Sequence, residues 1–188
     1  MPPIDLPIVL PRLTLRAYRL DDLGPLSDMN AHPDVARYLY ADVLTPEESR
    51  TVLERKMAET SFGTQDENLS LAVARNEDDA FLGGVVLRMV DEASRGAEIG
   101  FIFHPDHQGH GYAGEAARAV LDLAFGPLGL HRVIGQCDAR NDASAQVMKR
   151  LGMRQEAHFI SNEFVKGEWC DELDFAVLED EWPPSDGL

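Results

Sequence analysis

Three glycines stand close together near the middle of the chain, in the run Gln108-Gly109-His110-Gly111-Tyr112-Ala113-Gly114. A β-rich, mostly apolar segment, 97–103, precedes them, and apolar residues at helical spacing follow over 113–124. A helix whose first turn is rich in glycine offers unpaired backbone N–H groups and a positive dipole end. The stretch therefore predicts a strand, a turn and a helix that together bind a phosphate or pyrophosphate group.

A second polar pair, Asn141 and Ser144, follows the predicted strand 133–137. Asn141 stands at the start of a short predicted helix that Gly152 ends. Antiparallel hairpins are expected on either side of the glycines, from the strand-like runs 69–73 and 81–87 upstream and 159–165 and 169–177 downstream. The helix after the glycines leads by a right-handed crossover to a parallel neighbour. We therefore expect an α/β (α+β) fold with a central mixed, mostly antiparallel twisted sheet flanked by helices.

The elements that carry these residues fit one domain. The chain has 188 residues, of which 44% are hydrophobic and 27% charged, which is an ordinary globular composition. We expect a single domain over 1–188, with irregular tails at 1–11 and 183–188. The run Thr45-Pro46-Glu47-Glu48 predicts the start of a further helix, with a capping box and proline at the first helical position.

The charge balance excludes some partners. With 33 acidic and 17 basic side chains, the formal net charge is -16, which disfavours nucleic acid and anionic membranes. It suits a cationic or amine-bearing substrate, or simply keeps the protein soluble. No apolar run approaches the length of a membrane span, and the N-terminus lacks the features of a secretory signal, so a cytoplasmic location is expected. Cys137 and Cys170 lack metal or redox spacing and are expected to be reduced and buried.

Two readings of the glycines differ in the ligand they predict. Gly109, Gly111 and Gly114 satisfy the G-x-G-x-x-G pattern of dinucleotide-binding turns, and Asp138 ends the next strand, where that fold places its ribose carboxylate. However, the segment 104–108 separates the predicted strand from the first glycine, whereas a dinucleotide turn follows its strand directly. The antiparallel hairpins upstream and the short remainder of the chain also disfavour a doubly wound sheet.

The alternative pattern is Q-x-x-G-x-A, formed by Gln108, Gly111 and Ala113 after a strand that begins Glu98-Ile99-Gly100. With it the sequence resembles the GNAT superfamily of N-acetyltransferases, most closely the branch that includes the ribosomal-protein N-terminal acetyltransferases. EIGFIF-HPDHQGHGYAGEA resembles the acetyl-CoA strand and pyrophosphate loop of that family, and NDASAQVMKRLGM resembles its N-x-x-S-x-x-x-x-x-x-L-G-F/M segment. The resemblance covers roughly 12–177 and implies a single GNAT-like domain.

This resemblance implies an acetyl-CoA site. Backbone N–H groups of the glycine turn would surround the pyrophosphate, the main chain of the strand would pair with the pantetheine amides, and Asn141 would bind the pantetheine arm or else only cap its helix. His110 and Gly114 stand where the family more often has a basic residue and a hydroxyl residue. The implied cofactor-binding residues are Phe101, Ile102, Phe103, Gln108, Gly109, His110, Gly111, Tyr112, Ala113, Gly114, Asn141 and Ser144.

The implied reaction is transfer of an acetyl group from acetyl-CoA to a primary amine by direct attack in a ternary complex. Ser144 is the candidate general acid for the departing thiolate, with first-turn capping as the alternative role. Glu98 is the leading candidate for the base that takes the proton of the amine, with a surface ion pair as its alternative. Glu163 and Asp171 on the terminal hairpin are weaker candidates.

Other features of the sequence leave the acceptor open. The segment 30–44 and the terminal hairpin are expected to contact it, and protein N-termini, polyamines, aminoglycosides and small amine metabolites all fit. The hairpin could also mediate a homodimer. Three histidines recur at every third position from His104 to His110, but Pro105 and the glycines place them on a loop, so no metal site is predicted. A non-catalytic acyl-CoA-binding module is the alternative function.

Overall fold

One eight-stranded sheet, in the order β1-β2-β3-β4-β5-β6-β8-β7, runs through the whole fold. The computed structural model describes residues 4–39, 42–65 and 67–183. The strands are β1 (Ile8–Val9), β2 (Leu13–Arg16), β3 (Asn68–Arg75), β4 (Phe81–Asp91), β5 (Gly96–Phe103), β6 (Arg132–Asp138), β7 (Arg154–Val165) and β8 (Glu168–Leu178). The helices are η1 (Leu20–Asp22), α1 (Leu23–Ala31), α2 (Pro33–Ala36), α3 (Pro46–Ala58), η2 (Pro105–His107), α4 (Tyr112–Phe125) and α5 (Asp142–Arg150).

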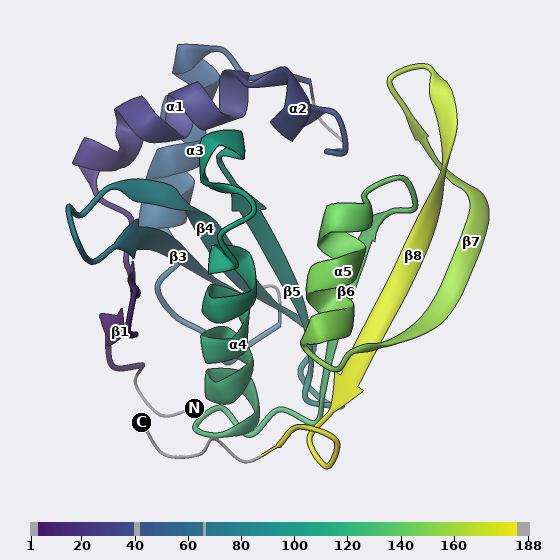
Figure 1. Cartoon of the computed structure of the whole chain (residues 1–188). Coiled ribbons are helices and arrows are strands. Elements are labelled where there is room, and N and C mark those ends of the chain that lie inside the picture. The colour runs from purple at the N-terminus through teal and green to yellow at the C-terminus, as the bar shows by residue number, and fades with distance from the viewer. Residues whose placement is uncertain (1–3, 40–41, 66, 184–188) are drawn as a thin grey trace.

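Neighbouring strands are antiparallel except for β5 and β6. These two strands are parallel, and α4 connects them. Their pairing covers only three residues of each strand, from Gly96 opposite Arg132 to Glu98 opposite Ile134. Beyond Glu98 no ladder joins the two strands within the described part of the chain, whereas β5 stays paired with β4 as far as Phe103. The sheet therefore separates at this point into a first wing, β1 to β5, and a second wing, formed by β6, β8 and β7 (Figure 1).

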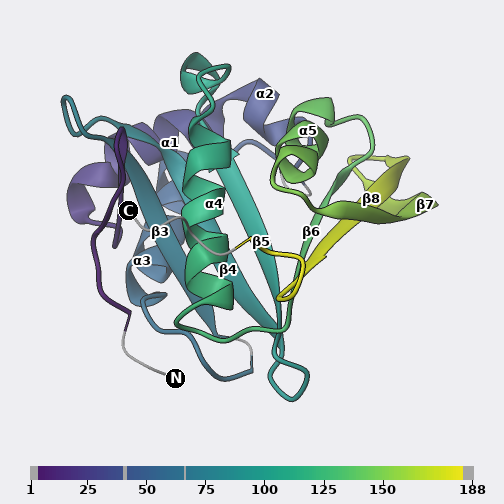
Figure 2. The same ribbon diagram turned by 60° about the horizontal axis from the view of Figure 1, so that its bottom comes forward.

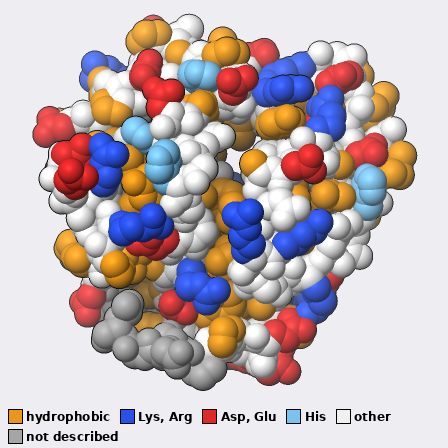
Figure 3. All heavy atoms as spheres, viewed as in Figure 1, with side chains coloured by type: hydrophobic (Ala, Val, Ile, Leu, Met, Phe, Trp, Pro, Cys, Tyr) orange, Lys and Arg blue, Asp and Glu red, His pale blue; other side chains and the backbone are white. Residues whose placement is uncertain are grey.

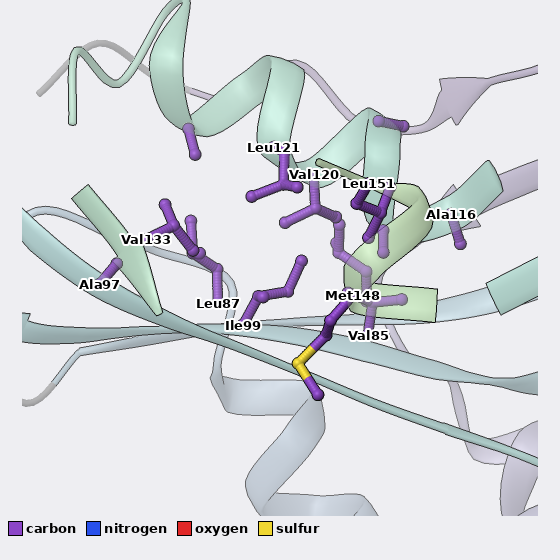
Figure 4. Packing of buried hydrophobic residues seen from close by; sticks show 14 of the residues in the cluster. Val85, Leu87, Ala97, Ile99, Ala116, Val120, Leu121, Val133, Met148 and Leu151 are labelled. Atoms are coloured by element: carbon purple, nitrogen blue, oxygen red, sulfur yellow. The ribbon is translucent and has the colours of Figure 1, made fainter. Parts of the chain in front are cut away.

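Helices cover both faces of the sheet. Helices α4 and α5 pack on one face, α4 over β3 to β5 and α5 beside β6, while α1 and α3 pack on the opposite face of the first wing (Figures 1 and 2). In Figure 4, Val120 and Leu121 of α4 lie over Leu87, Ile99 and Val133 of the strands. These residues are at most 2% exposed, and their burial supplies the main driving force for this layer.

The fold class and the local signals of the sequence are confirmed by the structure. Thr45 caps α3, and its capping box with Glu48 is present. Asn141 caps α5. The helix ends before Gly152, and Gly152 itself has a left-handed conformation with a φ of 82°. Both cysteines are free and buried, and burial raises the pKa of the Cys137 thiol to about 11.

The ends of the chain differ in part from the expected tails. A two-residue strand, β1, pairs with β2 inside the segment 1–11, which was expected to be irregular. Residues 1–3 and 184–188 of the two expected tails lie outside the described residues. Among the helices of the described segments, none has the length and apolar character needed to cross a bilayer.

Candidate active site

A cleft of about 1040 Å³ opens where β5 and β6 separate. It lies between α4 and α5, and α2 borders it at one end. Figure 3 shows it as a hollow near the centre of this face, with basic side chains gathered near it. Of the twelve cofactor-binding residues expected from the sequence, eleven line it: Phe101, Ile102, Phe103, Gln108, Gly109, Gly111, Tyr112, Ala113, Gly114, Asn141 and Ser144.

The glycine turn forms the end of the cleft at the start of α4. Gly109 and Gly111 have φ of 79° and 81°, in the left-handed region that favours glycine. The first intrahelical bond runs from the N–H of Glu115 to the carbonyl of Gly111, so the N–H groups of 112–114 have no acceptor within the helix. A Cβ on Gly114 would meet no protein atom within 4 Å. The turn thus leaves free donors and open space, which fits a pyrophosphate group.

Arg12, at the start of the first wing, braces this turn from outside. Its Nε donates to Oε2 of Glu115 at 2.7 Å, its Nη1 donates to the carbonyl of His110 at 3.1 Å, and its guanidinium lies 5.0 Å from the ring centroid of Tyr112. His110 stacks on Tyr112 with ring centroids 5.5 Å apart, but it is not among the residues that line the cleft. Sequence reasoning missed Arg12, because no local pattern links it to a turn so far along the chain.

Strand β5 contributes its unpaired edge to the cleft. The buried-and-exposed alternation of β5 stops at Gly100, and 100–102 are all partly exposed. Because β4 occupies the other edge as far as Phe103, the edge facing β6 keeps backbone donors and acceptors available after Glu98. This is the geometry that an extended, amide-bearing group needs in order to add as a strand.

Asn141 and Ser144 lie on the α5 wall of the cleft. Oδ1 of Asn141 accepts a hydrogen bond from the backbone N–H of Ser144 at 3.1 Å, so the capping role holds. This bond uses the oxygen of the Asn141 amide and the main chain of Ser144. The amide NH₂ of Asn141 and the hydroxyl of Ser144 have no hydrogen-bond partner among the described residues, and both can act in the cleft.

Glu98 lies at the last paired position of β5 and β6, where the two strands begin to separate. Its Oε2 accepts a hydrogen bond from Nη1 of Arg88 at 3.0 Å, in an ion pair between β4 and β5. Glu98 is not among the residues that line the cleft, and neither are Glu163 and Asp171. Asp171 instead accepts a hydrogen bond from the backbone N–H of Ser161. This bond and the nearby His158 lower the pKa of the Asp171 carboxyl group.

Arginines supply the positive charge that the glycine turn lacks. Arg118 on α4 and Arg150 at the end of α5 both line the cleft, and Arg37 lines it after α2. Arg118 also lies over Trp182, with its guanidinium carbon 5.0 Å from the ring centroid. Sequence reasoning did not single out these arginines. Their spacing along the helices could have indicated them, since Arg118 is one helical turn beyond Gly114.

The far end of the cleft is formed by the segment after α1. Val35 and Leu39 provide apolar lining there, with Tyr38 between them. Tyr40 and Ala41, within the expected acceptor segment 30–44, lie outside the described residues. Nζ of Lys166, at the tip of the β7–β8 hairpin, donates to the carbonyl of Ala36, so the second wing reaches across to α2.

Two remaining expectations concern metal and nucleotide ligands. In the described segments, no group of three or more histidine, cysteine or acidic side chains is arranged to hold a metal ion. Asp138, the carboxylate that a dinucleotide reading requires, is 4% exposed and pairs with Arg140 at 2.7 Å. Three of the residues that separate β5 from Gly109 form the short helix η2, which a dinucleotide turn lacks.

Comparisons with known proteins agree with this geometry. The family model for the acetyltransferase (GNAT) domain matches residues 12–154. The uncharacterized N-acetyltransferase YnaD of Bacillus subtilis is 31% identical over 93% of this chain and 98% of its own length. The putative ribosomal N-acetyltransferase YdaF of the same organism is 30% identical, but over only 56% of this chain, so the expected closeness to the ribosomal branch rests on a shorter match.

Solved structures show the same fold over nearly the whole chain. The crystal structure of a GNAT-family acetyltransferase from Bacillus anthracis superposes with a TM-score of 0.85 at 30% identity, covering 94% of this chain and 100% of that one. Spermidine N-acetyltransferase from Vibrio cholerae, crystallised with CoA and spermine, has a TM-score of 0.76 at 22% identity, covering 90% and 96% of the two chains. The family match, the full-length relative and the cleft between the two wings together establish that this chain belongs to the GNAT family of acetyltransferases.

Proposed function

We propose that this enzyme transfers an acetyl group from acetyl-CoA to a primary amine, by direct attack of the amine while both substrates are bound. The observation that carries the proposal is the cleft itself. It brings the free N–H groups of the glycine turn, the open edge of β5 and the hydroxyl of Ser144 into one space. Direct attack requires no side chain to carry the acetyl group. A site for acetyl-CoA and an adjoining site for the amine are sufficient for the transfer.

The residues present fit acetyl-CoA, which would supply an activated acetyl thioester. The N–H groups of 112–114 and the left-handed turn before them would hold the pyrophosphate, and Arg118 and Arg150 would add charge near the phosphates. The β5 edge at 101–103 would pair with the pantetheine amides. The amide NH₂ of Asn141 would donate to the same arm, while its oxygen remains the cap of α5.

Ser144 is proposed as the general acid of the reaction. Its hydroxyl lines the cleft and is not used in capping, because the backbone N–H makes the bond to Asn141. A hydroxyl placed there can donate a hydrogen bond or a proton to a leaving thiolate. This position on the first turn of a helix also places the positive dipole end near the developing negative charge.

Glu98 is proposed as the final proton acceptor, reached through water. It does not line the cleft, so the proton of a bound amine cannot pass to it directly. It lies on the sheet face opposite α4, as does Ile102 of the cleft lining, because side chains alternate along a strand. The ion pair with Arg88 holds the Glu98 carboxylate in place on this face of the sheet.

Polyamines such as spermidine are the first acceptor class that we propose. The net charge of -16 favours a polycation over a neutral amine, and a structural neighbour was crystallised with spermine. Protein N-termini are the second class, which the shorter match to a putative ribosomal N-acetyltransferase supports. Aminoglycosides and small amine metabolites stay in the acceptor panel.

The test is release of free thiol from acetyl-CoA with a panel of amines. We expect at least one polyamine to stimulate release and to be recovered as a mono-acetylated product by mass spectrometry. If acetyl-CoA raises the melting temperature but no amine stimulates release, the chain is a binding module rather than an enzyme. A melting temperature raised by NAD and unchanged by acetyl-CoA would instead contradict the proposed cofactor site.

A further inference from the structure

Two His-Pro-Asp turns meet beside the cleft. One, 32–34, starts α2, and the other, 104–106, starts η2. In each turn, Nδ1 of the histidine accepts a hydrogen bond from the backbone N–H of the aspartate, at 3.2 Å in both cases. The imidazole rings of His32 and His104 meet edge to face, with centroids 5.7 Å apart. Two segments far apart in the sequence are therefore joined through two rings that each also cap a turn.

The two turns belong to different walls of the cleft. His104 is 13% exposed, and its backbone N–H donates to the carbonyl of Leu82 in β4 at 2.9 Å, so η2 is fixed to the sheet. Helix α2 has only four residues, and the segment 34–39 lines the acceptor end. The ring of His104 is therefore fixed. Contact with this ring lets His32 set the position of the segment 34–39, which lines the acceptor end.

We propose that His32 and His104 are positioning residues which, as neutral imidazoles, hold α2 against η2 and thereby set the acceptor end of the cleft. Protonation of either ring weakens this contact and the binding of the amine. The kinetic part of this inference rests on the proposed acetyl transfer, whereas its structural part concerns the ring tautomers and does not.

The neutral state follows from the hydrogen bonds. A ring nitrogen can accept from a backbone N–H only when it carries no proton, so both rings must be Nε2–H tautomers. Nε2 of His104 lies 3.4 Å from Oδ2 of Asp28 on α1, which suits a nitrogen that bears a proton. Protonation at Nδ1 would remove the capping acceptor and place a charge on each of two rings in contact.

Several charged groups surround the rings of His32 and His104 and act on a proton bound there. Oδ2 of Asp34 lies 3.8 Å from Nδ1 of His32, and Oδ2 of Asp106 lies 3.7 Å from Nδ1 of His104. Together with Asp28, these carboxylates would accept a hydrogen bond from a charged ring. The opposing influences come from the third ring, His107, 5.7 Å from His104, and from Arg75 beside it. Burial, His104 and Arg75 lower the pKa of His107.

Nitrogen-15 NMR of the histidine rings tests the structural part on the intact protein without substrate. At pH 8 we expect His32 and His104 to show an unprotonated Nδ1 and a protonated Nε2. Spectra that show Nδ1–H at either residue at pH 8 would overturn the proposal, whether or not an amine acceptor has been found. Assignment uses the single variants His32→Asn and His104→Asn.

Kinetics with the best amine of the panel tests the functional part. His32→Ala is expected to raise the KM for the amine about fivefold at pH 8, the loss typical of a helix cap, with the Kd for acetyl-CoA unchanged. His32→Asn keeps a capping side chain but loses the ring contact with His104, so it is expected to raise this KM by less than the alanine variant does. An unchanged amine KM in His32→Ala, or a wild-type KM in the asparagine variant, would contradict the positioning role.

The pH profile separates this role from a merely structural one. Histidines change charge between about pH 5 and 8, so the wild-type KM for the amine is expected to rise on acidification in this range. The double variant His32→Asn/His104→Asn is expected to lack this part of the rise. His131→Asn is the matched control, since His131 pairs with Glu179 and does not line the cleft, and it should keep the wild-type profile. A double variant with the wild-type profile would overturn the proposal.

Discussion

The two ends of the cleft offer different groups to the ligands that we propose for them. The proposed cofactor end is built from β5 and the glycine turn that follows it, together with the start of α5, and it offers mostly main-chain groups. The acceptor end is built from the segment 34–39 and is bridged to the β7–β8 hairpin by Lys166, and it offers side chains. The first end depends on local backbone geometry, and the second depends on contacts between segments far apart in the sequence.

This difference explains how one fold can serve many amines. A pyrophosphate and two amides can be bound by backbone donors and acceptors, which any sequence supplies once glycines allow the right dihedral angles. An amine acceptor must be selected by side chains, which vary without disturbing the sheet. Changes at the cofactor end should therefore affect all substrates alike, whereas changes at the acceptor end should affect one amine more than another.

The largest expected effect concerns the side chain of Ser144, at the end that offers mostly main-chain groups. Ser144→Ala should lower kcat about a hundredfold, because the leaving thiolate loses its proton donor. The Kd for acetyl-CoA, measured by calorimetry, should stay unchanged, since the cap uses the backbone N–H of this residue. Ser144→Thr keeps a hydroxyl and should retain most of the activity. An alanine variant with normal kcat and weaker cofactor binding would assign Ser144 to structure.

A second prediction tests whether the backbone of the turn carries cofactor binding. Gly111→Val forces a β-branched residue to φ 81° and should weaken acetyl-CoA binding about thirtyfold, the cost of strain at one such residue. Gly129→Val is the matched control, at φ 58° in the turn after α4, where a Cβ meets no atom within 4 Å, whereas a Cβ on Gly111 would lie in ordinary contact with Nη2 of Arg12 at 3.7 Å. The control should lose stability without losing affinity. Equal affinities in the two variants would refute the assignment.

The third prediction concerns Glu98, which lies where the two wings begin to separate. Glu98→Gln should lower kcat about tenfold, a smaller loss than for a directly placed base, because water can pass the proton to bulk solvent instead. Arg88→Gln removes the partner of the same ion pair and serves as the control. If both variants lose the same small amount of activity, Glu98 is a structural residue of β5. The measurement is kcat at saturating acetyl-CoA and amine.

The sequence predicted more of the lining of the proposed cofactor end than of the proposed acceptor end, for a physical reason. Glycines, capping residues and hydrophobic periodicity act locally, so the β5 strand, the turn, α4 and α5 could be predicted from consecutive residues. The brace from Arg12 and the contact between His32 and His104 join distant segments and have no local signal. The place of Glu98 also had no local signal, since it depends on where the two strands separate: they do so only after Glu98, which therefore does not line the cleft.

The smallest expected effect tests the charge at the rim of the cofactor end. Arg150→Gln should weaken acetyl-CoA binding about threefold at low salt, with little loss at 0.5 M salt, because exposed charges are screened. Lys149→Gln makes the same charge change one residue earlier on α5, but Lys149 does not line the cleft and lies over Phe175 instead.

Equal losses of acetyl-CoA affinity in the two variants would mean that only the total positive charge at the end of α5 affects binding. A loss confined to Arg150 would locate a phosphate contact at that residue. An effect of Arg150→Gln that depends on which amine is present would break the division between the two ends. In that case, the charges at the cofactor rim would also take part in choosing the acceptor.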